Sequence, residues 1–370
     1  MRVLYFTRDY TPHDHRFLSA LAKTKHEVYF LRLERRGHQQ EDRIVPQEVE
    51  QVIWRGGQRP AKRSDGLALL RDLRRVIRKV QPDVIHAGPI QTCALLSALS
   101  GFRPLVSMSW GSDMLKDTDR GWAWRWATKY ALKHTDVLVG DCRAVQEKAT
   151  TFGFPKDRVV LFPWGVDLEQ FKPSKNSAYR ERRGWEDNFV ILSLRSWAPI
   201  YGVDNVVRAF ARAVQVKPAL RLLLLGNGPQ AGLIHSIVRR HELEDKVLFG
   251  GQVSNKDLAG MYHAADLYLS ASHSDGSSVS LMEALGCGLP VLVSDIPGNK
   301  EWITEGQEGW LFPDGDETAL AEGMLRAYDE REKSQKWRIA ARKLAEERAD
   351  WNKNFAKLLE AYEMAHKRAK

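Results

Sequence analysis

The sequence predicts an α/β protein made of two successive domains, each with a parallel sheet covered by helices on both faces. Three observations support this prediction. Short aliphatic runs alternate with amphipathic stretches, as in βαβ units. The alternation breaks off and starts again after about residue 185. The chain of 370 residues is long for one domain and suits two of ordinary size.

Buried strands are expected where short runs rich in Val, Ile, Leu and Phe lie between amphipathic segments. Parallel strands of this type are covered on both faces, so their sequences are almost continuously apolar. The expected strands are residues 3–7, 27–33, 83–87, 104–109, 136–140 and 159–162 in the first half, and 189–194, 220–226, 247–250, 266–272 and 290–295 in the second.

Helices are expected between the strands, where apolar residues recur every three or four positions. The clearest are residues 66–80, 90–100, 203–214, 258–265 and 279–288.

The two halves are joined by residues 163–177, whose two prolines and one glycine indicate a hinge. From about residue 333 the chain is charged and helical to its end. We therefore expect a first domain at residues 1–168, with a C-terminal helix at 351–370, and a second domain at 169–350.

The composition is that of a folded globular protein, with 43% hydrophobic and 28% charged residues. No apolar stretch approaches the roughly 18–20 residues needed to span a bilayer. The first ten residues read as a strand and not as a signal peptide. The three cysteines are scattered, which argues against a disulfide framework. A cytoplasmic location is expected from these features.

The net charge of +9 is carried by the first half, which has 28 Lys and Arg against 18 Asp and Glu through residue 165. The first domain is therefore expected to bind an anionic partner. Residues 55–80 are strongly basic, and residues 119–134 form a second basic stretch. This second stretch places aromatic residues on one helical stripe with cations beside it: Trp122, Trp126 and Tyr130, with Arg125, Lys129 and Lys133.

Two interpretations of this stripe stay open. The favoured one is that the aromatic residues pack on the sheet, because helices of such domains need an apolar face. The other is an interfacial helix that binds an anionic membrane surface at its inner, cytoplasmic face. Nucleic acid is not an expected partner, because no recognition motif accompanies the charge.

Residues 270–298 are the most informative segment. A strand ends, a polar turn follows, and a helix begins near Val279. Ligands of open parallel sheets bind at the carboxyl ends of strands, and a helix N-terminus attracts anions. Gly276 would let the backbone approach a phosphate, and Ser277 and Ser278 would add hydroxyl donors. The alternative is an ordinary capped helix, since Ser and Asp are common N-caps.

Two acidic residues favour the functional interpretation. Asp275 lies in the turn, and Glu283 lies eight positions later in the helix. Glu283 neighbours the apolar Leu281 and Ala284, so its carboxylate is expected to be partly buried and to need partners. A ribose diol supplies two donors at this distance from phosphates bound at the helix start, and Asp275 would reach the sugar beyond them.

This segment resembles the E-x7-E motif of the family 4 retaining glycosyltransferases, in the form Asp275-x7-Glu283. Other segments resemble the family in the same order. Residues 162–173, FPWGVDLEQFKP, are similar to the interdomain P-N-G-V-D-x-x-x-F-x-P segment, and residues 222–230, LLLLGNGPQ, to L-x-x-x-G-x-G-P. Residues 265–303 are similar to the core of the donor domain. The order and spacing together cover nearly the whole chain, which makes the resemblance specific.

The resemblance implies the GT-B fold, in which two Rossmann-like domains face each other across a cleft and the C-terminal helix crosses back to the first domain. It implies that a nucleotide-diphosphate sugar binds the second domain and the acceptor binds the first. A hexose-type sugar would pass to a glycan, a lipid-linked acceptor or a polysaccharide intermediate. The family retains anomeric configuration and works without a metal, so no cofactor is expected beyond the nucleotide sugar.

Residue roles follow from the matching positions. In the family the second acid of the motif binds the ribose and the first contacts the donor sugar, which implies these roles for Glu283 and Asp275. Arg195 matches the arginine that grips the diphosphate. Tyr201 stands where the family has a lysine, so one cation is missing. The other positions expected to bind the donor are Gly276, Ser277, Ser278, Val279, Gly226, Gly228 and Val253.

The acceptor side is expected in the first domain. Residues 107–117 resemble an H-G-S-D segment, with Trp110 in place of the histidine. Trp110 cannot move a proton but can form an apolar wall. The family's front-face mechanism, in which the leaving phosphate takes the acceptor's proton, fits this replacement. Asp113 is a third catalytic candidate beside Asp275 and Arg195, as a group that orients the acceptor hydroxyl.

Four other residues are assigned to the acceptor or sugar side: His13, Asp14, Arg16 and His86. Arg16 could compensate for the missing lysine. The two histidines could also be purely structural, which is the commoner role of a lone histidine at a strand end.

Residues 117–119 have the D-x-D form used for Mn²⁺ or Mg²⁺, but a solvated turn is favoured and no metal site is expected. Two other functions stay open. One is a nucleotide-sugar-binding protein with little or no transfer, suggested by Trp110 and the missing lysine. The other is a sugar epimerase or a phosphorylase on the same fold, for which the sequence offers no specific support.

Overall fold

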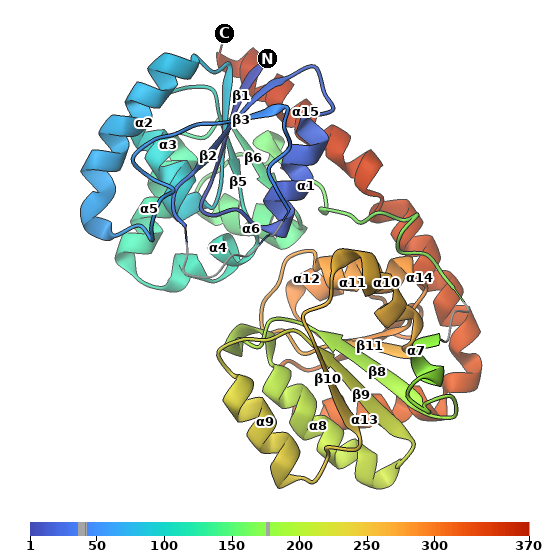
Figure 1. Cartoon of the computed structure of the whole chain (residues 1–370). Helices are drawn as coiled ribbons and strands as arrows, with labels where there is room; N and C mark the ends of the chain where they lie inside the picture. Colours follow the sequence, from blue (N-terminus) through green and yellow to red (C-terminus); the bar gives the residue numbers. More distant parts are fainter. Residues whose placement is uncertain (36–40, 42, 175–177, 370) are drawn as a thin grey trace. The chain divides into compact units, whose positions relative to one another are not determined.

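The computed structural model describes residues 1–35, 41, 43–174 and 178–369 (Figure 1). The chain divides into two compact units, Met1–Phe162 with Phe355–Lys370, and Pro163–Asn354. The domain boundaries expected from the sequence, after residues 168 and 350, differ from these by a few residues. Residues 175–177 of the expected hinge lie outside the described residues. Each unit has its own parallel sheet and its own core.

The first unit contains a parallel sheet in the order β3-β2-β1-β4-β5-β6-β7. The strand order reverses at β1, as in doubly wound folds. All six strands expected here are confirmed. The additional strand β3 has three residues and one buried apolar side chain, too little to be predicted. The strands are β1 (Arg2–Thr7), β2 (Glu27–Arg32), β3 (Val49–Gln51), β4 (Val84–Ala87), β5 (Leu105–Met108), β6 (Val137–Gly140) and β7 (Val159–Leu161).

Helices cover both faces of this sheet. Leu4 and Phe6 point into a core shared with α2, α3 and α5. Tyr5 points to the opposite face, where its hydroxyl donates to Asp14 of α1 at 3.0 Å. The helices of the first unit are α1 (Pro12–Leu21), α2 (Gly66–Val80), α3 (Leu95–Ser100), α4 (Ser112–Leu115), α5 (Trp122–Lys133) and α6 (Arg143–Thr151), joined by the end of α15 (Trp351–Ala369).

The expected return of the C-terminal helix to the first unit is confirmed. Tyr362 of α15 is fully buried, and its hydroxyl lies 2.6 Å from Nδ1 of His86 on β4. The ring of His26 lies edge-on to the Tyr362 ring, with their centroids 6.2 Å apart. The last helix therefore completes the core of the first unit.

The favoured interpretation of the aromatic stripe is wrong for its two tryptophans. Trp122 is 83% exposed and Trp126 is 52% exposed. The buried face of α5 consists of smaller residues, which let the helix pack closely and leave the bulky rings outside: Ala127, Thr128, Ala131 and Leu132.

The second unit contains a parallel sheet in the order β10-β9-β8-β11-β12-β13. All five strands expected here are confirmed, and β13 was missed because it is short and begins with glycine. The strands are β8 (Phe189–Leu194), β9 (Leu220–Leu225), β10 (Val247–Gly251), β11 (Leu267–Ser270), β12 (Val291–Ser294) and β13 (Gly309–Phe312).

Alternate side chains of these strands enter two cores. Leu222 and Leu224 of β9 pack with α8, α9 and α13, whereas Leu223 and Leu225 pack with α10, α11 and α14. Figure 1 shows these two sets of helices on opposite faces of the sheet. The helices of the second unit are α7 (Ala178–Glu181), α8 (Val203–Val216), α9 (Ala231–Arg240), α10 (Asn255–His263), α11 (Val279–Gly286), α12 (Pro297–Lys300), α13 (Glu317–Asp329) and α14 (Ser334–Arg348).

Candidate active site

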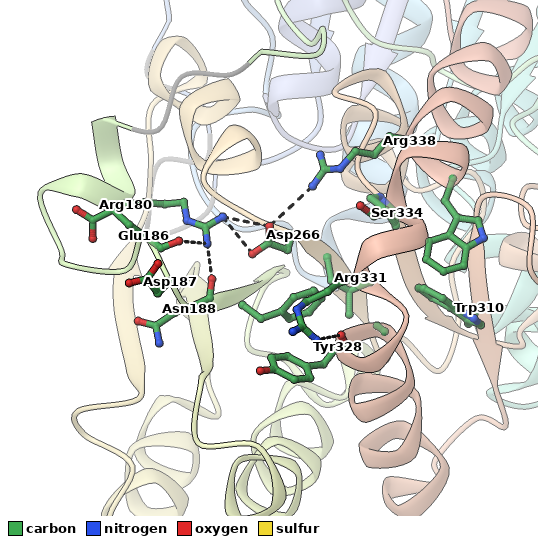
Figure 2. A pocket seen from close by; sticks show the side chains of 15 residues that line it. Arg180, Glu186, Asp187, Asn188, Asp266, Trp310, Tyr328, Arg331, Ser334 and Arg338 are labelled. Carbon is green, nitrogen blue, oxygen red and sulfur yellow. Dashed lines mark hydrogen bonds and ion pairs between the residues drawn. The ribbon is translucent and has the colours of Figure 1, made fainter.

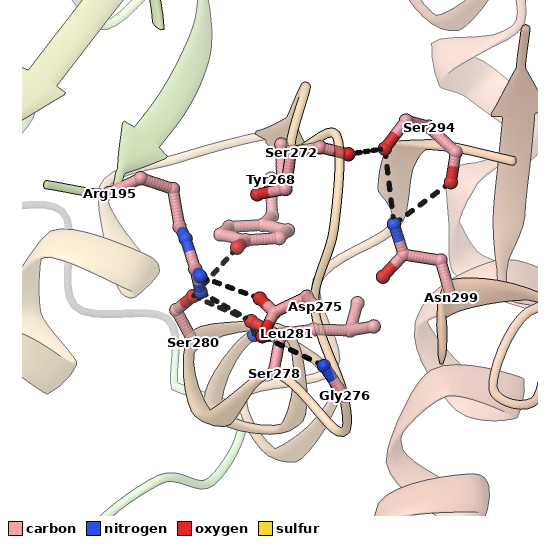
Figure 3. A network of polar contacts seen from close by, with 11 residues as sticks. Arg195, Tyr268, Ser272, Asp275, Gly276, Ser278, Ser280, Leu281, Ser294 and Asn299 are labelled. Carbon is pink, nitrogen blue, oxygen red and sulfur yellow. Dashed lines mark hydrogen bonds and ion pairs between the residues drawn. The ribbon is translucent and has the colours of Figure 1, made fainter. Parts of the chain in front are cut away.

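Arg195 follows β8 and reaches the N-terminus of α11 (Figure 3). One guanidinium nitrogen donates to Oγ of Ser278 at 2.7 Å and to Oγ of Ser280 at 3.1 Å. The other donates to Oδ2 of Asp275 at 2.6 Å. The structure thus brings Arg195 and Asp275 together at the carboxyl ends of β8 and β11, where ligands of open parallel sheets bind.

The Arg195 guanidinium is a cation held in place by Asp275. Burial alone would lower the pKa of the Arg195 guanidinium, but the Asp275 carboxylate outweighs this effect and the pKa lies above its ordinary value. The second oxygen of Asp275 accepts a hydrogen bond from the backbone N–H of Gly276 at 3.0 Å. A fixed cation therefore stands where the sequence predicts a diphosphate.

Glu283 lies in α11 and is only 7% exposed. Its Oε2 accepts a hydrogen bond from the hydroxyl of Tyr262 at 2.7 Å. Burial raises the pKa of Tyr262 well above its ordinary value, and Glu283 adds to the effect, so the phenol stays protonated and can donate. Ser278 is the N-cap of α11 and accepts from the N–H of Leu281 at 3.5 Å.

Tyr201 occupies the position where the resembled family has a lysine. It lies in a 3-10 turn at Pro199–Tyr201, and its ring centroid is 4.3 Å from the guanidinium carbon of Arg195. An aromatic face at this distance attracts a cation. Tyr201 therefore does not replace the missing charge but holds the Arg195 side chain in place.

Two of the glycines expected to bind the donor, Gly226 and Gly228, pack against the backbone of the loop that carries Arg195. Gly226 has φ of +100°, and a side chain there would lie 2.6 Å from the carbonyl oxygen of Arg195. A side chain at Gly228 would lie 2.7 Å from the backbone of Trp197. The loop after β9 can therefore pack directly on the loop after β8. Val253, in the loop after β10, is half-buried and packs against the core beneath α11 together with Val279.

Five supporting residues were not predicted from the sequence: Tyr262, Tyr268, Ser280, Gly298 and Trp302. The hydroxyls of Tyr268 and Ser280 lie 2.8 Å apart, and Nε1 of Trp302 donates to Oγ of Ser277 at 3.1 Å. A side chain at Gly298 would lie 2.4 Å from the carbonyl oxygen of Gly276, so only glycine lets α12 pack this closely on the turn. Tyr262 lies in α10 and Tyr268 in β11, and no local sequence pattern predicts their polar contacts.

The predicted acceptor side lies at the carboxyl ends of strands in the first unit. The rings of His13 and Trp110 have centroids 5.8 Å apart, and Phe17 lies 6.1 Å from Trp110. Arg16 is half-buried on the same helix as His13. The structure therefore brings three of the predicted residues, His13, Arg16 and Trp110, to the start of α1 and the loop after β5.

Asp113 faces the inside of its loop. It is 3% exposed, and its Oδ1 accepts hydrogen bonds from Oγ of Ser109 at 2.7 Å and from the N–H of Trp110 at 2.9 Å. Its Oδ2 accepts from the N–H of Ile90 at 2.9 Å. Burial raises the pKa of Asp113 to about 6. This carboxylate positions the loop that carries Trp110, and it does not reach the molecular surface.

Asp14 and His86 also have internal partners. Asp14 is 1% exposed and closes a capping box with Thr11, whose N–H donates to it at 2.9 Å, and burial raises its pKa to about 6. His86 is 2% exposed, and burial lowers its pKa to about 3, so it is neutral. In this conformation both side chains are occupied by internal partners. Their positions in the sequence did not reveal that they point inward.

The D-x-D residues form ion pairs. Asp117 contacts Arg120 at 2.9 Å, and Asp119 contacts Lys148 at 2.9 Å. Among the described residues, no group of three or more His, Cys, Asp or Glu is placed to hold a metal ion. None of the helices in the described part of the chain has the length and apolar character that crossing a bilayer requires.

Two family models match the chain, one on each half. The model described as Glycosyltransferase Family 4 matches residues 13–170, and the model described as Glycosyl transferases group 1 matches residues 175–344. Together they leave few residues unmatched.

Two similar proteins match most of this chain. The chain is 26% identical over 273 residues to N-acetyl-alpha-D-glucosaminyl L-malate synthase of Bacillus anthracis. The match covers 72% of this chain and 70% of that protein. It is 23% identical over 305 residues to a GDP-mannose-dependent phosphatidylinositol monomannoside mannosyltransferase of Mycolicibacterium smegmatis, covering 78% of each. The chain spans less than two thirds of six other curated relatives, 24 to 58% of their length.

Among solved structures, Anabaena HepE in complex with UDP-glucose superimposes with a TM-score of 0.80. The match covers 98% of this chain and all of that one, with 20% identical residues. Sucrose-phosphate synthase of Thermosynechococcus elongatus matches with a TM-score of 0.81 and 18% identity over 98% of both chains. At this level of identity the likeness is one of fold.

Proposed function

The chain belongs to the family 4 glycosyltransferases and has the GT-B fold, and from this premise we propose that it uses a nucleotide-diphosphate sugar as donor. A hexose-type sugar passes to a glycan, a lipid-linked acceptor or a polysaccharide intermediate. The reaction retains anomeric configuration and needs no metal.

One observation supports the donor site above all others. At the N-terminus of α11, Arg195 is held by Ser278, Ser280 and Asp275. The buried Glu283 lies in the same helix. The first N–H groups of an α-helix have no partner within the helix and attract anions. The diphosphate binds there beside Arg195, Glu283 accepts hydrogen bonds from the ribose, and Asp275 lies next to the sugar.

The chemistry depends on charge stabilisation at the leaving group. Departure of the nucleotide diphosphate builds negative charge, which Arg195 and the helix N-terminus offset. Trp110 replaces the histidine of the resembled segment, and Asp113 is committed to its own loop. Because neither supplies a base, the leaving phosphate oxygen takes the acceptor's proton on the face where the new bond forms. This order of events retains configuration.

Two nucleotide sugars are the first candidates for the donor. UDP-glucose is the ligand of the Anabaena HepE complex, and GDP-mannose is the donor named for the mycobacterial relative. A thermal-shift screen with UDP-, GDP-, ADP- and TDP-sugars identifies the donor, because a ligand that binds the folded state raises the melting temperature.

Transfer is then measured with the donor so identified. Glu283→Ala and Arg195→Ala should each reduce the thermal shift and slow the transfer of labelled sugar, and EDTA should leave transfer unchanged. Donor binding without transfer or hydrolysis would favour the alternative, a nucleotide-sugar-binding protein. No shift with any nucleotide sugar would contradict the proposal. Loss of activity on addition of EDTA would contradict its metal-independent part.

The exposed face of α5 supports peripheral association with an anionic membrane. Trp122 and Trp126 project into solvent, and three exposed cations share the helix: Arg125, Lys129 and Lys133. Aromatic rings beside cations suit the interface of a bilayer with anionic lipids. A lipid-linked acceptor would be found at such a surface.

A further inference from the structure

A cavity lies at the opposite end of the second sheet from Arg195. Figure 2 shows the side chains that line it. It has a volume of about 320 Å³ and is lined by Phe189 and Leu267, at the amino ends of β8 and β11, and by Pro290, just before β12. With a rise of about 3.3 Å per residue, the six steps from Phe189 to Arg195 place roughly 20 Å between this cavity and Arg195. The cavity is therefore separate from the candidate active site.

Three arginines line the cavity, and two of them, Arg180 and Arg338, face the same carboxylate. Arg180 contacts both oxygens of Asp266 at 3.1 Å. The N–H of Val190 donates to the same carboxylate at 2.9 Å. Arg338 comes no closer than 3.9 Å to Asp266. One carboxylate thus faces two guanidinium groups, and it is already satisfied by Arg180.

The other two acidic residues of the lining offer little compensation. Glu186 and Asp187 are exposed to solvent, where their charges are screened. The pKa of the Arg338 guanidinium lies below its ordinary value, because burial disfavours the charge and Asp266 offsets the effect only in part. An anion in the cavity would stabilise the charged form of Arg338.

Arg331 is the third cation and is held against an aromatic wall. Its guanidinium donates to the carbonyl oxygen of Tyr328 at 2.8 Å and lies 4.3 Å from the centroid of the Tyr328 ring. Ser334, the first residue of α14, also lines the cavity. The positive end of a helix of 15 residues therefore opens at the same place as Arg331 and Arg338.

We propose that this cavity binds a small phosphorylated ligand, whose phosphate is gripped by Arg331 and Arg338 at the start of α14 and whose body packs on Tyr328. Guanidinium groups match phosphate oxygens in geometry and charge. Ligand pockets begin at about 300 Å³, so the volume suits a phosphate with a small organic body. The site is additional to the one that binds the nucleotide sugar.

The test uses the full chain carrying Arg195→Ala, so that phosphate binding at the candidate active site is weakened and does not obscure the result. Inorganic phosphate and glycerol 3-phosphate are titrated by isothermal titration calorimetry. Tighter binding of glycerol 3-phosphate is expected, since its body can contact Tyr328. Arg331→Gln and Arg338→Gln should each weaken binding about tenfold or more, because each removes a charge-assisted contact.

Two further variants complete the test. Lys343→Gln changes a cation on the same helix, away from the cavity lining, and should leave binding unchanged. Ser334→Asp places a negative charge where the phosphate binds and should abolish binding, while suiting the start of a helix. Circular dichroism checks the fold of each variant. Failure of both probes to bind at millimolar concentration, or binding that survives Ser334→Asp and both Gln variants, would overturn the proposal.

Discussion

The hydroxyl of Tyr262 donates to Oε2 of Glu283 at 2.7 Å, so a residue of α10 sets the orientation of the carboxylate in α11 that is expected to bind the ribose. The same hydroxyl lies 3.1 Å from the carbonyl oxygen of Ser280. Tyr262 therefore contacts α11 at two residues, Ser280 and Glu283.

Tyr262→Phe tests this relationship. The variant keeps the ring in the core and removes one hydrogen bond to Glu283, which should cost about 1 kcal/mol and raise the Kd for the donor about fivefold. Calorimetric titration with the nucleotide sugar measures the change. Tyr179→Phe, in α7 of the same unit, is the matched control and should bind the donor normally. An unchanged affinity in Tyr262→Phe would mean that Glu283 needs no orientation by the phenol.

Arg195→Ala should reduce the rate of transfer by about 10²–10³-fold, because the fixed cation beside the leaving diphosphate is lost. Arg195→Lys should recover only part of the rate, since one ammonium nitrogen replaces the two guanidinium nitrogens that contact Ser278, Ser280 and Asp275. Initial rates at saturating donor measure both effects. Arg239→Ala, an exposed arginine of α9, should behave as the wild type. Full activity in folded Arg195→Ala would remove Arg195 from the mechanism.

His86 should make the first unit less stable at acidic pH. Its pKa is lowered from 6.5 to about 3 by burial, so the unfolded chain takes up a proton below pH 6.5 while the folded chain does not. This stability is present above pH 6.5 and is lost as the pH falls, with about 2 kcal/mol gone between pH 6.5 and 5. Asp14 and Asp113 act in the opposite direction over part of this range, because burial raises the pKa of each to about 6.

The comparison with His86→Gln separates His86 from these two carboxyls, which both proteins keep. Thermal unfolding at pH 7 and at pH 5 should show a larger fall in Tm for the wild type than for the variant. Equal falls in the two proteins would show that His86 is not neutral in the folded state.

Trp122→Ser with Trp126→Ser should weaken binding to anionic vesicles without affecting stability, since both rings are exposed. Losing two interfacial aromatic rings should reduce the bound fraction several-fold in a sedimentation assay. Vesicles without anionic lipid should bind weakly in either case, because the cations of α5 act through the surface charge. Ile339→Ser, an exposed apolar residue of α14, is the control. Equal sedimentation of the double variant and the wild type would exclude α5 as the contact.

Much of the fold could be predicted because its strands are nearly continuous aliphatic runs. The eleven expected strands are present, whereas β3 and β13 carry too few apolar residues to be recognised. The polar turn at residues 273–278 was also predictable, since a strand ends before it and a helix begins after it. The meeting of Arg195 with Asp275 follows from the rule that neighbouring parallel strands end at one edge.

The rest depends on tertiary contacts. The contacts of Tyr262 with Glu283 and of Tyr268 with Ser280 join residues of different elements, so no local spacing predicts them. Asp113 and Asp14 were assigned to the acceptor side, but their side chains turn inward to backbone and hydroxyl donors. The exposed position of Trp122 depends on which face of α5 packs more closely, which hydrophobic periodicity alone does not reveal.

The contact between His86 and Tyr362 has a consequence for synthesis on the ribosome. Tyr362 lies in the segment that follows the whole second unit in the chain, yet it is buried in the first unit. While the chain emerges in order, the second unit has all of its residues before the first has received its last helix. The unit that is made first is therefore completed later, and a nascent chain exposes the surface around His86 until the segment that contains Tyr362 has left the exit tunnel.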